Sequence, residues 1–414
     1  MSLHITIIAL GSTGDILPYA TLGHHLRSVG YEVLFVTSEN YRSLISGLKL
    51  SFLGVPGDAK SVIEASGANI FSLFRSFADL SRGLSAVLDP EHPEINHTDL
   101  ILNQLPIGVY GYDLAERLGV PMIQAAVIPL TPTKSFPMVG WPAASSKNPT
   151  YNRLSCRVYE QLTWLYMRQT INQWRREKLG LQKRPIRNYW PDGQSGRPET
   201  LYGFSTHVLE RPTDWDDRIH ICGYWFLDEA DWSPPDRLSA FLDAGEPPLF
   251  IGFGSMPISD PVQTTKLLVK AVQESGHRAI FHAGWADIGG MKLPDAVLKI
   301  DYAPYQWLFP KMSAVIHHGG SGTTGSALWS GVPSLAVPFL FDQFFWGKRI
   351  AALGIGHEPI PFKKLDSDKL CGAIQTLTND LIIKQKASIL GGKIRAEAGV
   401  ENAAKIIREL VEKP

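Results

Sequence analysis

The stretch that decides the fold runs from Ala314 to Gln343 and reads AVIHHGGSGTTGSALWSGVPSLAVPFLFDQ. Residues 314–316 form a short apolar run of the kind typical of the end of a buried strand. A glycine-rich loop follows, residues 323–329 favour a helix, and residues 334–338 predict the next parallel strand. The stretch is therefore a βα turn, in which backbone N–H groups and the positive end of a helix can approach an anion.

Composition narrows the class of protein. The chain has 414 residues, zero formal net charge, 44% hydrophobic and 19% charged residues. That length suits two domains, and the neutral charge argues against nucleic acid as a partner. The three cysteines lie far apart without a CxxC pair, so neither a zinc knuckle nor a disulfide framework is predicted. No run approaches ~18 apolar residues and the start lacks a basic signal-peptide region, so we expect a cytoplasmic protein without a membrane span.

Strands and helices alternate along the chain. Residues 4–10 predict a strand, 18–29 a helix and 32–37 a second strand, which together make a βαβ unit. The same order of strand, small-residue loop, helix, glycine and strand returns between residues 249 and 282. This weak internal repeat predicts an α/β protein with two facing, Rossmann-like, doubly wound parallel sheets. Ligands in such sheets bind outside the carboxyl ends of the strands, so we expect the site in the cleft between the domains.

The domain boundaries are placed by composition. Prolines and charges concentrate in residues 213–248, which is typical of a linker. The segments expected are an acceptor-binding N-terminal domain at 1–212, the linker at 213–248, a donor-binding C-terminal domain at 249–392, and a C-terminal helix at 393–414 that packs back on the first domain.

The glycine-rich loop has a rival interpretation. Residues 320–325 fit G-x-G-x-x-G, and Asp342 follows the next strand, as in a nicotinamide- or flavin-dependent oxidoreductase. Two features count against this alternative: His317-His318 precede the glycines, and Gln343 follows Asp342. Because adjacent residues of a strand point in opposite directions, one metal on both histidines is not expected. We expect one histidine on a diphosphate and the other in packing.

Asp15 is the second chemical candidate, because it leaves the first predicted strand at the start of a helix. It either caps that helix or faces the cleft as a general base. Two Asp-x-Asp triplets, at 214–216 and 366–368, do not follow apolar strands, and no metal site is predicted from them. Residues 70–88 have apolar side chains at helical spacing, which indicates either a core face or a wall for an apolar acceptor.

An ordered set of motifs carries a family resemblance. The motifs are GSTGDILP at 11–18, TPTKSFP at 131–137, GYWF at 223–226, GFGSM at 252–256, HHGGSGTT at 317–324 and GVPSLAVPFLFDQFFWG at 331–347. Over essentially its whole length the chain resembles the GT-B glycosyltransferases of the UDP-glycosyltransferase superfamily. It is most similar to the sterol glucosyltransferase-like branch and to the bacterial glycopeptide-antibiotic transferases.

The resemblance implies an inverting, metal-independent hexosyltransferase that needs no cofactor, because the nucleotide sugar is a co-substrate. It implies that Asp15 is the general base and that Ser12 reaches the diphosphate from the N-terminal domain. The residues implied in donor binding are Ser255, Tyr302, His317, Gly319, Gly320, Ser321, Gly322, Thr323, Asp342 and Gln343. Of these, Asp342 and Gln343 would bind the sugar, Ser255 would lie near the nucleotide, and Tyr302 occupies the base-stacking segment. Tyr302 and Tyr305 depart from plant relatives there, which have a tryptophan and a glutamine.

The same resemblance implies UDP-glucose as the donor and a flat apolar alcohol, such as a sterol, triterpenoid or flavonoid, as the acceptor. Phe74, Phe136 and Trp141 are the expected acceptor walls. We expect a monomer, and a lipid acceptor would bring peripheral contact with a membrane. A sugar-nucleotide binder without catalysis is the third alternative.

Overall fold

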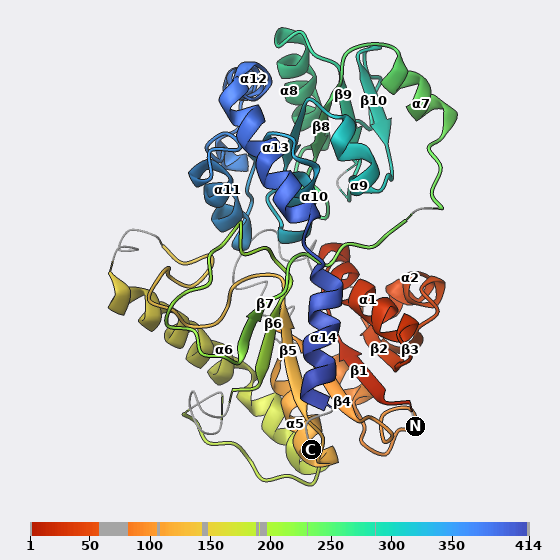
Figure 1. Cartoon of the computed structure of the whole chain (residues 1–414), viewed down its shortest axis with the longest axis vertical. Coiled ribbons are helices and arrows are strands. Elements are labelled where there is room, and N and C mark those ends of the chain that lie inside the picture. Colours follow the sequence, from red (N-terminus) through yellow and green to blue (C-terminus); the bar gives the residue numbers. More distant parts are fainter. Residues whose placement is uncertain are drawn as a thin grey trace. The chain divides into compact units, whose positions relative to one another are not determined.

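The computed structural model describes residues 2–57, 82–105, 108–142, 148–187, 190, 197–229, 231–285 and 287–411. The chain divides into two compact units (Figure 1). Unit 1 comprises residues 1–206, 210–226 and 398–414, and unit 2 comprises residues 207–209 and 227–397. Each unit is a parallel sheet covered by helices, so the predicted α/β class with two Rossmann-like sheets is confirmed.

The sheet of unit 1 has seven strands in the order β3-β2-β1-β4-β5-β6-β7, all parallel. The strands are β1 (His4–Ile8), β2 (Glu32–Ser38), β3 (Ser51–Val55), β4 (Leu100–Gln104), β5 (Met122–Ala126), β6 (Glu199–Tyr202) and β7 (Ile219–Ile221). Most of these strands are near-continuous apolar runs, because helices bury both faces of a parallel sheet.

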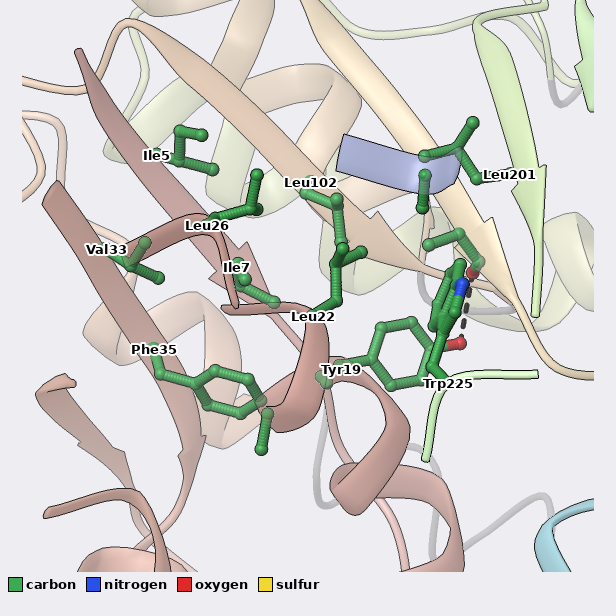
Figure 2. Close-up of a cluster of buried hydrophobic side chains, with 14 of the residues drawn as sticks. Ile5, Ile7, Tyr19, Leu22, Leu26, Val33, Phe35, Leu102, Leu201 and Trp225 are labelled. Carbon is green, nitrogen blue, oxygen red and sulfur yellow. Dashed lines mark hydrogen bonds between the residues drawn. The ribbon is translucent and has the colours of Figure 1, made fainter. Parts of the chain in front are cut away.

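The helices of unit 1 build two cores on opposite faces of that sheet. They are α1 (Thr13–Ser28), α2 (Arg42–Gly47), α5 (Gly108–Leu118), α6 (Pro149–Glu177) and α14 (Gly399–Val411), with a 3₁₀ turn at Glu39–Tyr41. Ile7 of β1 points into the core with α1 and α14, and Ile8 into the core with α5 and α6. Figure 2 shows the first core, where the rings of Tyr19 and Trp225 meet edge to face at 5.9 Å.

The predicted helix at 70–88 lies mostly outside the described residues. Two of its apolar positions, Leu84 and Leu88, are described, and both are fully buried in the second core. For these two positions the core interpretation holds.

The C-terminal helix α14 belongs to unit 1, although the preceding residues belong to unit 2. It packs against α1, and Asn402 Nδ2 donates to the carbonyl of Cys222 at 3.1 Å. Apart from residues 207–209, which belong to unit 2, the chain changes units at residues 226–227 and 397–398. The segment expected as a linker, 213–248, contributes β7 to unit 1 and a helix to unit 2, because its charged and proline-rich sequence forms short edge elements.

Unit 2 has a five-stranded parallel sheet in the order β10-β9-β8-β11-β12. The strands are β8 (Leu249–Gly252), β9 (Ala279–His282), β10 (Val297–Ile300), β11 (Ala314–His317) and β12 (Ser334–Ala336). The helices are α7 (Asp236–Asp243), α8 (Pro261–Glu274), α9 (Tyr305–Leu308), α10 (Ser321–Ser330), α11 (Asp342–Ala352), α12 (Ser367–Asn379) and α13 (Leu381–Arg395), with 3₁₀ turns at Phe309–Lys311 and Phe362–Lys364.

The deciding stretch folds as its residues predict. β11 is wholly buried and lies between β8 and β12, pairing with both. Helix α10 ends at Gly331, whose φ of 75° is the left-handed C-cap conformation that glycine adopts readily. Among the described residues, no helix is long and apolar enough to cross a bilayer.

Candidate active site

In unit 1, Asp15 lies at the carboxyl edge of the sheet, in the first turn of α1 directly beyond β1. Its Oδ2 accepts two hydrogen bonds from Ser12, one from the backbone N–H at 2.9 Å and one from the hydroxyl at 2.8 Å. Within the described residues its Oδ1 makes no hydrogen bond. The carboxylate is therefore held in place through one oxygen, which leaves the other available to a substrate proton. Asp15 therefore takes part in capping the start of α1, and its role as a general base stays a prediction.

The backbone before α1 is shaped for this carboxylate. Gly11 has a φ of 141°, and a Cβ added there would lie 2.6 Å from Asp15 Oδ2, so only glycine allows so close an approach. The Gly11 carbonyl accepts from the hydroxyl of Tyr41 at 3.2 Å. The sequence offered a small-residue loop as a signal, but not the contact that makes Gly11 necessary.

The surroundings of Asp15 act on its pKa in opposite directions. Burial raises the pKa of the carboxyl above its ordinary value, and the hydrogen bonds from Ser12 lower it. Burial is the larger effect. A raised pKa moves a carboxylate toward the range in which a general base takes a proton efficiently.

The expected acceptor loop, residues 131–142, follows β5 and lies at the same carboxyl edge. Asp214 anchors it by accepting from the Thr133 hydroxyl at 2.7 Å and from the Lys134 backbone N–H at 2.9 Å. Asp214 belongs to the first Asp-x-Asp triplet, and these bonds give it a structural role. Phe136 contacts Trp215 edge to face at 6.5 Å.

Of the two remaining acceptor candidates, the structure describes one. Trp141 is half-buried at the end of this loop, with its backbone N–H donating to the carbonyl of Met138 at 2.9 Å. Phe74 lies outside the described residues. Tyr19 and Tyr202, which sequence reasoning missed, are fully buried residues of this neighbourhood. Burial, the charge of Asp15 and the neighbouring Tyr202 all raise the pKa of Tyr19, and the Tyr202 hydroxyl accepts from the N–H of Thr131 at 2.8 Å.

In unit 2, His317 is the last residue of β11 and is fully buried. Its Nδ1 accepts from the backbone N–H of Gly319 at 3.1 Å, so the ring proton of the neutral form sits on Nε2. Nε2 has no hydrogen-bond partner among the described residues. Burial, with His318 as the second cause, lowers the pKa of His317 to about 3, so the ring is a neutral hydrogen-bond donor at physiological pH.

His318 has a packing role between two loops. A Cβ added at Gly254, after β8, would lie 3.1 Å from His318 Cε1, and a Cβ at Gly320 would overlap its Nε2. Burial and the neighbouring His282 lower the pKa of His318 to about 4. His282 ends β9 on the same sheet edge, and a lone histidine at the end of a strand gave no sequence signal of this neighbourhood.

The glycine-rich loop leads into the amino end of α10. Gly319 has a φ of 89°, and a Cβ there would lie 2.9 Å from the carbonyl oxygen of Gln343. Gly320 is the N-cap, and no side chain caps this end of α10. Ser321, Gly322 and Thr323 form the first turn of the helix. A helix end of this kind favours an anion through its N–H groups and its dipole.

The sugar-binding candidates follow β12. The side chain of Gln343 is buried, and its Oε1 accepts from the backbone N–H groups of Phe339 at 2.7 Å and Leu340 at 3.1 Å. Its Nε2 donates to Met256 Sδ at 3.0 Å. Gln343 therefore positions the turn that presents Asp342, a role that the resemblance did not imply.

The turn before Asp342 is strained. Phe341 has φ 47° and ψ −118°, and the N–H of Gln343 bonds to the carbonyl of Leu340 at 3.3 Å. This is a type II′ turn whose second position normally requires glycine. Backbone strain of this kind concentrates at binding sites.

Two further donor candidates lie at the same sheet edge. Ser255 is half-buried in the loop after β8, next to Gly254, whose φ is 58°. Tyr302 follows β10, is more than half exposed, and donates its hydroxyl to Glu229. Tyr305 instead stacks on Phe309 at 4.4 Å and hydrogen-bonds to Thr323, so it supports the first turn of α10.

Comparison with solved structures identifies the fold. The chain has the GT-B fold: it matches the glycotransferase of kitacinnamycin with a TM-score of 0.75 at 19% identity, over 99% of this chain and 100% of that one. It matches the calicheamicin glycosyltransferase with a TM-score of 0.71 at 18% identity, over 99% and 98%. The glycosyltransferase VinC in complex with DTDP matches with a TM-score of 0.65 at 16% identity over the full length of both chains.

Sequence relatives narrow the class. Residues 269–411 match the family described as the erythromycin biosynthesis protein CIII-like C-terminal domain. Within the GT-B class, the chain is similar to proteins named sterol 3-beta-glucosyltransferases, which confirms the resemblance carried by the motifs. It is 33% identical to one from Arabidopsis thaliana and 32% identical to one from Cryptococcus neoformans, each over 97% of this chain. The chain spans 65% of the Arabidopsis relative and 27% of the Cryptococcus relative.

Proposed function

We propose that the protein is an inverting glycosyltransferase that moves glucose from UDP-glucose to the hydroxyl of a sterol or a similar flat apolar alcohol. The observation that carries the proposal is the Asp15 carboxylate, which Ser12 holds through one oxygen while the other makes no hydrogen bond to the described residues. A sugar-nucleotide binder without catalysis would use this carboxylate only to cap α1, and turnover by the Asp15→Asn variant separates the two roles.

The reaction follows from the groups present. The acceptor oxygen attacks the anomeric carbon from the face opposite the diphosphate, and its proton passes to Asp15. As the new C–O bond forms, the bond from the anomeric carbon to the diphosphate oxygen breaks, which inverts the configuration. An alcohol is too weak an acid to ionise first, so proton removal accompanies attack.

The diphosphate leaving group is assigned to unit 2. The uncapped amino end of α10 supplies a positive dipole, and His317 supplies a neutral Nε2–H donor. Solved GT-B structures in complex with thymidine diphosphate support a nucleoside diphosphate in this fold. Asp342 is assigned to the sugar hydroxyls, and Gln343 is assigned to holding the turn that presents Asp342. The glucosyltransferase names of the relatives favour glucose.

The test is an acceptor panel with UDP-glucose, read by mass spectrometry. We expect a hexose adduct on sterols or triterpenoids, and thermal stabilisation of the protein by UDP but not by NAD or NADP. No adduct with any acceptor, together with stabilisation by NAD or NADP, would favour the oxidoreductase alternative instead. None of the relatives or structures reported above is an oxidoreductase.

A further inference from the structure

Apolar side chains gather on the outer face of α6. The large apolar residues exposed in unit 1, among those described, are Val29, Leu154, Leu162, Leu165, Tyr166 and Ile186. All except Val29 lie on α6 or on the loop that follows it (Figure 1). The spacing of Leu154, Val158, Leu162 and Leu165 repeats every three or four residues, so these side chains form one stripe along the helix.

The opposite face of α6 is fixed in the core. Trp164, Ile171 and Trp174 are buried between the helix and the sheet. Arg175 pairs with Asp113 and with Glu116 of α5. With its inner face held in this way, α6 cannot rotate to bury the stripe. Leu154 and Leu162 are 55% and 52% exposed, against a core that leaves Trp164 with no exposure.

The loop after α6 extends the apolar face. Gln161 Nε2 donates to the carbonyl of Ile186 at 3.0 Å, and Trp164 Nε1 donates to the carbonyl of Pro185 at 3.0 Å. These bonds hold Ile186, which is 55% exposed, beside the helix.

Positive charge borders the stripe. Arg157 is exposed and Arg168 is half-buried on one flank of the helix, and Lys183 and Arg187 are exposed in the adjoining loop. The acidic residues of α6 are Glu160 and Glu177. Arg197 neutralises Glu160 with contacts of 2.5 and 2.7 Å to its two oxygens, and Glu177, at the end of the helix, lies 3.9 Å from Arg176.

We propose that this face of α6, the stripe with its basic border, docks on an anionic lipid bilayer. Leucines would enter the boundary between headgroups and acyl chains, and the arginines would bind lipid phosphates. A second copy of the chain fits less well, because a two-fold contact through this face would bring two basic borders together. The inference is independent of the proposed reaction, although a sterol-like acceptor resides in such a bilayer.

Sedimentation with vesicles tests the proposal without donor or acceptor. The probe is a vesicle of equal parts phosphatidylcholine and phosphatidylglycerol, compared with pure phosphatidylcholine. We expect binding to the anionic vesicles alone, a loss of about tenfold in R157Q/R168Q and at least as much in L162E/L165E. The matched control is L381E/I382E, which places the same charges on exposed apolar residues of α13 in unit 2 and leaves binding unchanged.

Three outcomes overturn the proposal. The first is wild-type protein that stays in the supernatant, and the second is L162E/L165E that binds as well as wild type. The third is a wild-type dimer in light scattering that L162E/L165E converts to a monomer, which would make this face a subunit interface. Far-UV circular dichroism and cooperative thermal unfolding show that each variant is folded.

Discussion

Ser12 and Asp15 form a closed hydrogen-bonded corner at the start of α1, in which the backbone N–H and the hydroxyl of Ser12 both donate to Asp15 Oδ2 at 2.9 and 2.8 Å. The arrangement orients the carboxylate while burial raises its pKa. In the proposed reaction, the pair would set both the direction in which the base faces and the pH at which it becomes active.

Removing the Ser12 hydroxyl should move the acid side of the pH profile. A general base acts when it is deprotonated, so kcat/KM rises as the pH passes upward through the pKa of Asp15. Ser12→Ala removes a donor that stabilises the charged form, so that pKa should rise by about one unit. The measurement is kcat/KM against pH for wild type, S12A and the control S28A at the other end of α1. An acid limb that stays in place in S12A, or moves to lower pH, would refute the role of Ser12.

His317 should act as a neutral hydrogen-bond donor. Its pKa of about 3 leaves it uncharged above mildly acidic pH, so the UDP affinity that it contributes should not change between pH 6 and pH 8. His317→Ala should weaken UDP binding by about tenfold, because a hydrogen bond to a charged group is lost. His317→Gln, which keeps a donor and an acceptor, should lose less. Calorimetry at the two pH values checks this, and a defect in H317A that appears at the lower pH alone would indicate a charged histidine.

Replacing Asp214 should weaken acceptor binding and leave donor binding unchanged. Asp214→Ala removes both bonds that hold the 131–142 loop, so the KM for acceptor should rise by about tenfold, as expected for two lost hydrogen bonds. UDP affinity should stay the same, because the residues assigned to the donor, apart from Ser12, lie in unit 2. The matched control is Asp216→Ala, which lies in the same triplet and contacts Arg218 instead. A loss of UDP or metal affinity in D214A would favour the Asp-x-Asp metal interpretation that the sequence disfavoured.

At position 341, glycine should give a more stable protein than alanine, which is the reverse of the usual order inside a helix or strand. At φ 47° and ψ −118° a side chain strains the backbone, so F341G should be more stable than F341A by about 1 kcal/mol. Comparing these two variants cancels the loss of the phenyl ring. The control position is Gly372 inside α12, where nothing surrounds the added Cβ and alanine should stabilise. Thermal unfolding measures both, and an F341A that melts above F341G would show that the turn is not strained.

Local sequence predicted the parts of the fold that depend on local rules. The run at 314–316 and the glycines after it became β11, a loop and α10, because burial on both faces selects apolar strands and positive φ selects glycine. The position of Asp15 beyond β1 followed from the same alternation.

Contacts between distant residues could not be predicted in this way. Nothing in the sequence links Gln343 to Met256, or Asp214 to the 131–142 loop, because each pair is joined by tertiary packing. The return of the C-terminal helix to the first domain was expected with the domain boundaries, and the contact of Asn402 with Cys222 appears only in the structure. A βα turn in the sequence predicts that an anion can bind there. Which side chains can contact the anion depends on tertiary packing, which the sequence does not show.

Turnover by Asp15→Asn tests the central claim most directly. The amide keeps the size of the side chain and an oxygen for Ser12, but it cannot accept the acceptor proton. We predict that kcat with UDP-glucose and a sterol acceptor falls by about two to four orders of magnitude. The folded pKa of Asp15 is raised, so its charge costs stability as the pH rises through that pKa, and the neutral D15N protein should melt no lower than wild type at neutral pH. A D15N protein with wild-type turnover would contradict the account.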